Sequence, residues 1–264
     1  FIVKEFMNGL MIKVLFYNSL NYEKSIYYLN IFILMRKYIY LAIFLAGIVT
    51  PKDTQAQDVG ISFSYFLPKN GYFSTPISPF SLRGLGFNIG NYMAIQSGFS
   101  LYRMSGMNVI DMDDFETKDP IVGPNFTLLI PVEFVLQYIT DRQEFKIKGG
   151  GFAFQTFDNK IMNGNLDKAI RQFEGWEVAN SQVDFDNSLG LGYFFGAEYV
   201  IFVTGQWGLS FEVNYFIGHA DFPLTGSYTG GTSISGLSTR TFDYQDAKLD
   251  FTGLEISVGI IISQ

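Results

Sequence analysis

Six ionisable residues of this chain have types and positions that could act together. They are Glu133, Glu198, Glu212, Glu255, Lys146 and Lys148. Each glutamate lies in a segment where apolar residues alternate with small or polar ones, and it occupies one of the small or polar positions. The two lysines lie in a glycine-rich segment. Carboxylates in a crowded interior must be paired or neutralised, because an isolated buried charge is costly. We expect a structural network of ion pairs. A path for protons or cations is the alternative, and a narrow barrel leaves little room for one.

A cation is needed where two of these carboxylates meet. Glu198 and Glu212 lie on segments joined by a tight turn near Gly205, so they should sit opposite or diagonal to each other. Like charges at that spacing repel each other unless a cation lies between them. Lys148 is the best candidate for this cation, with Glu133 reaching it from the other side.

His219 is the one histidine of the chain, and Asp221 follows two residues later. A hydrolytic site needs a base, an orienting carboxylate and a nucleophile within reach of one another. The serines that follow His219 (Ser227, Ser233 and Ser235) have no spacing that marks one of them as a nucleophile. We therefore expect His219 to be structural and the chain to carry no catalytic residue.

The acidic residues between positions 111 and 119 could offer oxygen ligands to calcium. Their spacing lacks the glycine and the closing glutamate of an EF-hand loop, which favours a solvated acidic loop. The sequence also has no phosphate-binding glycine motif, metal-ligand cluster or cofactor signature. We expect no cofactor and no metal site, and the residues identify no ligand.

The elements that must position these residues are strands. Eight segments alternate apolar with small or polar residues at a period of two, which predicts strands with two unlike faces. They cover residues 59–67, 84–90, 95–102, 126–134, 145–156, 188–199, 207–218 and 253–260. The facing of the fifth segment is ambiguous, because it is rich in glycine. In the others, we expect the small and polar set to face a narrow lumen and the apolar, aromatic set to face lipid.

The connections between these segments alternate in length. Short ones fall at 90–92, 137–144 and 203–206, and long ones at 68–80, 105–124, 157–187 and 219–246. This rhythm is typical of outer-membrane barrels, with short turns in the periplasm and long loops outside. The predicted fold class is all-β: a membrane-spanning, antiparallel, up-and-down β-barrel of about eight strands. A soluble lipocalin-type barrel is the competing fold, and it would need a charged outer face.

Two further features refine this prediction. Tyr92, Tyr138, Tyr199, Phe202 and Trp207 lie beside the short turns, where an aromatic girdle would meet the membrane interface. In the third long loop, residues 165–176 have apolar side chains at helical spacing. They predict a short amphipathic helix that caps the barrel or rests on lipid.

An export signal precedes the strands. Met35-Arg36-Lys37 is cationic, residues 38–49 are an apolar run of twelve, and Thr54-Gln55-Ala56 resembles a signal-peptidase site. We expect a signal peptide at 35–56, cleavage before Gln57 and a barrel domain at 57–264. Residues 1–34 start with Phe1, and 25 of them are Phe, Ile, Lys, Tyr, Asn or Leu. We interpret them as an upstream extension of the reading frame; an uncleaved anchor is the alternative.

The composition agrees with a membrane barrel. The whole chain has 18 basic and 25 acidic residues; six basic and three acidic residues precede Gln57, which leaves 12 and 22. This acidic excess argues against nucleic acid as a partner. Charged residues make up 16% of the chain and aromatic residues 17%, and cysteine is absent. Because the chain has no cysteine, no disulfide can stabilise the exported domain, and other interactions must do so.

One hairpin carries a family resemblance. Residues 184–193 (DFDNSLGLGY), Glu198-Tyr199 and residues 209–215 (LSFEVNY) resemble the closing hairpin of the Bacteroidetes outer-membrane β-barrel family. That family includes PorT-type proteins, alongside small OmpA- and OmpX-like eight-stranded barrels. The resemblance covers residues 57–264 loosely and implies the fold and an outer-membrane location. The last residue, Gln264, departs from the terminal aromatic residue common in proteobacterial barrels, which bears on recognition by the assembly machinery.

These observations predict a non-enzymatic outer-membrane protein that is structural or binds partners through its long extracellular loops. An accessory barrel of a PorT-like secretion machine is the alternative, followed by a small pore or a lipid-modifying enzyme. The expected partners are outer-membrane lipid and lipopolysaccharide, and the barrel-assembly machinery during biogenesis. Another envelope protein or an extracellular ligand is a further candidate partner.

Overall fold

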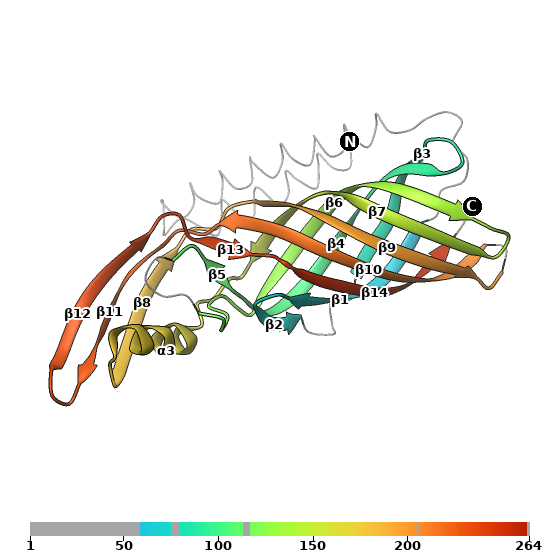
Figure 1. Cartoon of the computed structure of the whole chain (residues 1–264). Coiled ribbons are helices and arrows are strands. Elements are labelled where there is room, and N and C mark those ends of the chain that lie inside the picture. Colours follow the sequence, from blue (N-terminus) through green and yellow to red (C-terminus); the bar gives the residue numbers. More distant parts are fainter. Residues whose placement is uncertain (1–58, 75–79, 113–116, 205, 263–264) are drawn as a thin grey trace, which may run out of the picture. The chain divides into compact units, whose positions relative to one another are not determined.

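The computed structural model describes residues 59–74, 80–112, 117–204 and 206–262. Eight of its strands form a closed antiparallel barrel, in which each strand pairs with the next along the chain and the last, β14, pairs with the first, β1 (Figure 1). They are β1 (Val59–Pro68), β3 (Phe80–Asn88), β4 (Met93–Met107), β6 (Asn125–Ile139), β7 (Gln143–Phe157), β9 (Gly190–Phe202), β10 (Trp207–Asp221) and β14 (Gly253–Ile262). Each expected segment forms one of these strands, so the predicted up-and-down barrel is confirmed.

The barrel wall has apolar side chains outside and polar side chains inside. Along β6, Phe134 and Leu136 are exposed, whereas Glu133 and Gln137 between and beside them are buried. The same alternation orients β7, whose facing the sequence left open. Successive residues of a strand point to opposite faces, so one face of each strand lines the lumen and the other covers the barrel.

The two ends of the barrel differ. Short turns join β3 to β4, β6 to β7 and β9 to β10 at one end. The first residue of β1 lies at this end too, because Val59 pairs with Ile262, the last residue of β14. The connections at the other end are long, as expected, but they contain further strands. Two of these, β5 (Val109–Ile110) and β13 (Lys248–Asp250), pair with each other, and β13 also pairs with β10, so that they extend the wall. In the first long connection, β2 (Gly71–Ser74) pairs with β4.

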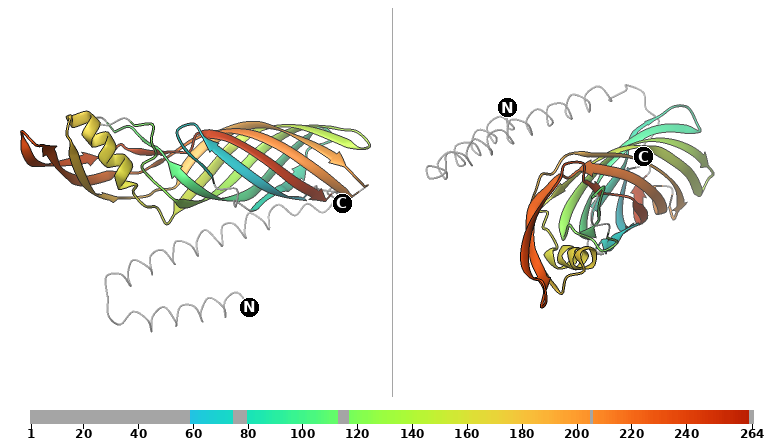
Figure 2. Two further views of the ribbon diagram at one scale, coloured as in Figure 1. Left: turned by 90° about the horizontal axis from the view of Figure 1, so that it is seen from below. Right: turned by 60° about the vertical axis from the view of Figure 1, so that its left-hand side comes forward.

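A second sheet stands beyond the barrel. We call it, together with its helix, the outer lobe: β8 (Val178–Phe185), β11 (Leu224–Thr232), β12 (Gly236–Tyr244) and α3 (Asn163–Glu174). Its strands are ordered β12-β11-β8 and come from two different long connections (Figures 1 and 2). Both connections were expected to be loops, and this sheet corrects that expectation.

The helix of the outer lobe was expected at 165–176 and lies at Asn163–Glu174. It ends at Gly175, whose left-handed φ of 68° suits glycine and lets its N–H donate to the carbonyl of Arg171. Leu166, Ala169 and Ile170 are buried in the core that the lobe shares with the loops. The apolar face of α3 is therefore covered by protein, which decides against one of the two alternatives for this helix, that it rests on lipid.

Aromatic rings fill the lumen at the level next to the long connections. The ring of Phe251 stacks on those of Phe66 and Phe154, with centroids 4.5 and 4.8 Å apart. Phe152 meets the ring of Phe216 edge-on at 5.1 Å. All five side chains are at most 4% exposed. We call this set, with Tyr102 and Phe194, the aromatic plug.

Among the described residues, no helix has the length and apolarity that crossing a membrane requires. The expected signal peptide at 35–56 and the extension at 1–34 lie outside the described residues.

Candidate functional site

All six ionisable residues singled out in the sequence lie inside the barrel. Their strands are β6, β7, β9, β10 and β14, and each residue is at most 5% exposed. They form a polar layer below the aromatic plug, on the side of the short turns. We call this layer the lumen network.

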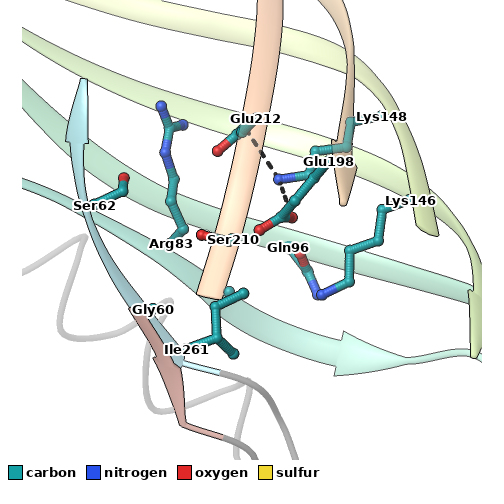
Figure 3. Close-up of a pocket in the computed structure, with 11 residues that line it drawn as sticks. Gly60, Ser62, Arg83, Gln96, Lys146, Lys148, Glu198, Ser210, Glu212 and Ile261 are labelled. Carbon is teal, nitrogen blue, oxygen red and sulfur yellow. Dashed lines mark hydrogen bonds and ion pairs between the residues drawn. The ribbon is translucent and has the colours of Figure 1, made fainter. Parts of the chain in front are cut away.

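Lys148 lies at the centre of one half of the network. Its Nζ is 2.7 Å from a carboxylate oxygen of Glu198 and 3.0 Å from one of Glu212 (Figure 3). Glu198 and Glu212 are directly opposite each other on β9 and β10. The lysine offsets the repulsion between two carboxylates that the strand register forces together. Charge-assisted hydrogen bonds of this kind are stronger than neutral ones.

Glu255 organises the other half. Nη2 of Arg83 donates to both oxygens of Glu255, at 3.0 and 3.1 Å, and the hydroxyl of Tyr102 donates to it as well. The amide of Asn214 donates to Glu255 at 2.7 Å and to Glu212 at 2.8 Å. Asn214 thereby joins the two halves into one continuous network.

The two remaining residues have different surroundings. Nζ of Lys146 is 3.0 Å from a carboxylate oxygen of Glu144, two residues earlier on the same strand. Glu133 is 1% exposed, and neither of its oxygens has a hydrogen-bond donor among the described residues. No hydrogen bond or ion pair therefore joins Glu133 to Lys148 among the described residues, although both line the same lumen.

Arg83 belongs to the lumen network although its position in the sequence did not predict it. In a regular strand, Arg83 would face the same side as Leu85, two residues later, and the side chain of Leu85 points outward and is 44% exposed. The register of β3 against β4 shifts between Leu82 and Leu85, and Gly84 has a left-handed φ of 82°. This bulge turns Arg83 inward, where it is 5% exposed. The glycine beside the arginine was the signal that could have indicated it.

Little open space remains within the network. A cavity of about 10 Å³ is bounded by Arg83, Gln96, Lys146, Glu198 and Glu212, among others (Figure 3). That volume is close to the minimum for one water molecule. The aromatic plug closes the lumen above it. The arrangement is suited to filling and stabilising a barrel, and it leaves no space for a substrate at this level.

A chain of buried hydroxyl groups runs across β14, β1, β3 and β4. Ser257 donates to Ser64 at 2.7 Å, Ser64 and Ser81 are 2.9 Å apart, and Ser81 donates to Ser100 at 2.8 Å. Small hydroxyls can hydrogen-bond one another in the space left beside larger polar groups.

The other sequence candidates lie apart from the lumen network. Nε2 of His219 lies 3.6 Å from a carboxylate oxygen of Asp250 of β13. Ser233 and Ser235 lie in the β11–β12 turn, bonded to Glu177 and Thr232. These contacts do not assemble a nucleophile, a base and an orienting carboxylate.

The acidic loop is only partly described. Asp111 pairs with Lys248 at 2.8 Å and Asp119 with Lys168 at 2.7 Å. Residues 113–116, which carry the other acidic side chains of the segment, lie outside the described residues. In the described part of the chain, no group of three or more acidic or histidine side chains could hold a metal ion.

Comparisons with known proteins give the following results. No protein-family model and no curated protein matches the chain. Among solved structures, the outer membrane protein OprG of Pseudomonas aeruginosa is 10% identical, with a TM-score of 0.42 over 80% of this chain and 97% of that one. The N-terminal β-barrel domain of OprF from the same organism is 7% identical, with a TM-score of 0.36 over 80% and 98%. Ail, the attachment invasion locus protein of Yersinia pestis, is 10% identical, with a TM-score of 0.33 over 79% and 97%. At these scores and identities the likenesses assign neither a family nor an activity.

Proposed function

We propose that this chain is a non-enzymatic outer-membrane β-barrel protein that presents its outer lobe to partners outside the cell. The observation that carries the proposal is the inverted wall of the barrel. Most charged residues of its strands lie in the lumen and most of its outward-facing side chains are apolar, which is the arrangement that a lipid environment favours; Arg103 of β4 is an exposed exception. A soluble barrel would have the opposite arrangement.

The outer surface supports insertion in a bilayer. Exposed apolar side chains occur on strands all around the barrel; examples are Phe63, Val132, Ile147, Phe195, Phe211 and Val258. A soluble monomer rarely exposes a contiguous apolar surface of this kind. Tyr92, Tyr138 and Trp207, beside the short turns, are 67%, 65% and 50% exposed. Their position matches that expected of a girdle of aromatic residues at a membrane interface.

The location of the binding surface follows from the filled lumen. Among the described residues, the cavity within the lumen network is only about 10 Å³, and the aromatic plug lies above it. The outer lobe, by contrast, carries exposed apolar residues at its far tip, including Ile234 and Leu237. We therefore assign partner binding to the lobe. Export with cleavage before Gln57, and insertion by the barrel-assembly machinery into lipid and lipopolysaccharide, are parts of the same proposal.

The proposal is tested by locating the protein and its lobe. The protein should fractionate with outer membranes, begin at Gln57 and migrate on gels at a position that depends on heating, because a closed barrel resists detergent until it is boiled. An epitope inserted between Ser233 and Ser235 should be labelled on intact cells. Recovery in the soluble fraction with residues 1–56 intact, or labelling only after lysis, would contradict the proposal.

A further inference from the structure

The sheet of the outer lobe has two outer edges, and they are protected differently. On β8, the backbone N–H of Ser181 donates to Asp167 of α3 at 2.8 Å, and the helix packs along the strand. β12 is the last strand on the other side of the sheet. Figures 1 and 2 show it at the outer margin of the lobe, with α3 near β8. Every second residue of an edge strand turns its N–H and C=O groups outward, where another strand can pair with them.

The sequence of β12 lacks the usual protection of an edge. Residues 236–241 are exposed on both faces of the sheet, and the strand contains neither proline nor lysine. Natural edge strands commonly use these residues to prevent pairing with other chains.

The one cationic side chain of β12 is turned away from the free edge. Nη1 of Arg240 is 2.7 Å from Glu174, and the guanidinium lies over the ring of Trp176, 5.6 Å from its centroid. Tyr228 donates to the same carboxylate at 2.7 Å. Burial and this hydrogen bond raise the pKa of Tyr228 to about 12, so it remains a donor at physiological pH. These contacts hold Arg240 on the face of the sheet that α3 covers.

The opposite, solvent-facing surface of the sheet has an ordered pattern. The strand register aligns Asn180 with Thr229 and Thr239, and the two threonine hydroxyls are 2.8 Å apart. Toward the barrel, it aligns Asp184 with Thr225 and Asp243. The four residues of β12 on this face, from the far tip toward the barrel, are Leu237, Thr239, Thr241 and Asp243. Leu237 is 75% exposed.

We propose that β12 is a docking site for an extended segment of another protein, which adds to the sheet as an antiparallel strand. This rests on the proposed function and names the mode of binding of the same lobe. Main-chain hydrogen bonds give such a complex its affinity, and alternate side chains give it specificity. Charge complementarity places a basic residue opposite Asp243, with Asp184 in the same row. Small or β-branched residues then lie opposite Thr241 and Thr239, and an apolar residue lies opposite Leu237.

A second copy of this chain fits the edge poorly. Two β12 strands paired antiparallel about Arg240 would set each Asp243 carboxylate against Leu237 of the other copy. A carboxylate opposite an apolar side chain gains neither an opposite charge nor an apolar contact. The occupant is therefore a different sequence, with its basic residue at the end nearest the barrel.

The test uses a synthetic peptide, KTTSVTL, blocked at both ends and labelled at its C-terminus. It is titrated against the full mature chain in lipid nanodiscs and followed by fluorescence anisotropy. We expect saturable binding. N-methylation of one alternate set of peptide amides should abolish binding, whereas N-methylation of the other set should leave it nearly unchanged, because only one set faces β12. Equal behaviour of the two sets, or no binding, would overturn the proposal.

Charge reversal tests the register. Asp243→Lys should weaken binding of the peptide roughly fivefold, and the peptide ETTSVTL should recover that loss. Asp184→Lys is the matched control: it changes the same row by the same charge but lies two strands from the edge, so its effect should be clearly smaller. Equal effects would indicate non-specific attraction and count against strand addition, as would cross-linking of two chains through Thr239→Cys. A heat-dependent gel shift on the same sample separates the outcomes. A normal heat-dependent shift without peptide binding would contradict only the docking site. Absence of the shift would contradict the proposed function.

Discussion

At the scale of residues, the lumen network is a problem of charge balance. Its cations are Arg83, Lys146 and Lys148, and its carboxylates are Glu133, Glu144, Glu198, Glu212 and Glu255, all of them buried. Carboxylates therefore outnumber cations among the described lumen residues. Removing one partner of a buried ion pair is strongly destabilising, because the other charge is left without compensation. The contribution of each residue depends on whether it has a partner.

Lys148→Ala tests the central cation. It leaves Glu198 and Glu212 opposed without a counter-charge, and we expect a loss of about 3–5 kcal/mol in the free energy of unfolding at neutral pH. The loss should shrink in mild acid, where a glutamate takes up a proton and removes the surplus charge. The double variant with Glu198→Gln should also recover stability. Thermal unfolding of the purified barrel in detergent, over a range of pH, measures each effect.

The matched control for this variant is Lys160→Ala, which removes an exposed lysine paired with Asp158 at 3.4 Å. Surface pairs of this kind contribute little, so it should leave the unfolding temperature unchanged. If Lys148→Ala were as silent as this control at every pH, the lumen network would not stabilise the barrel.

Glu133→Gln should stabilise the barrel, in contrast to Lys148→Ala. No described residue donates a hydrogen bond to the buried carboxylate of Glu133, so an uncharged amide of the same shape should raise the unfolding temperature at neutral pH. Glu255→Gln is the comparison, because it weakens the contacts with Arg83, Tyr102 and Asn214 and should lower that temperature. A lower unfolding temperature for Glu133→Gln would show that Glu133 has a partner in solution.

At the scale of elements, local irregularities and glycines make room for large groups in a narrow barrel. The bulge in β3 delivers Arg83 to the lumen. Glycines opposite the aromatic plug leave space for its rings: a Cβ at Gly192 would lie 2.5 Å from the ring of Phe152 and 2.4 Å from the carbonyl oxygen of Ile217. Side chains of alternating size fill the interior of small barrels in this way.

Gly192→Ala tests this packing. The added methyl must displace a buried ring or a strand backbone, and we expect a loss of about 1–3 kcal/mol in the free energy of unfolding. Gly151→Ala, in the neighbouring strand β7, is the control, since the nearest atom to its Cβ would be 3.6 Å away. Equal unfolding temperatures for the two variants would mean that the plug can rearrange without cost.

At the scale of the whole barrel, the polar layer and the aromatic plug lie one above the other in the same lumen. Either would narrow the lumen, and together they close it. An eight-stranded barrel is just wide enough for its own side chains, so a filled interior is consistent with its size.

The purified protein should therefore conduct poorly. Recordings in planar bilayers are expected to show no large, stable single-channel steps, with a porin of known conductance as the control for insertion. Large steps from the wild-type chain would favour a pore over the binding role proposed for the outer lobe.

By itself, the sequence determined the fold class, the strand count and the side chains that face the lumen on most strands. These depend on a period-two alternation, which is a local property that one segment carries on its own. The helix near residues 163–174 was predictable because the helical spacing of its apolar residues is also a local pattern. Only the tertiary structure decided the facing of Arg83, because one bulge at Gly84 reverses the parity on which the prediction depends. It also decided the lobe sheet, which pairs β8 with β11 from a different connection, and the aromatic plug, in which Phe251 meets Phe66 and Phe154. Such contacts join residues far apart in the chain, and their pairing depends on closure of the barrel rather than on any local pattern.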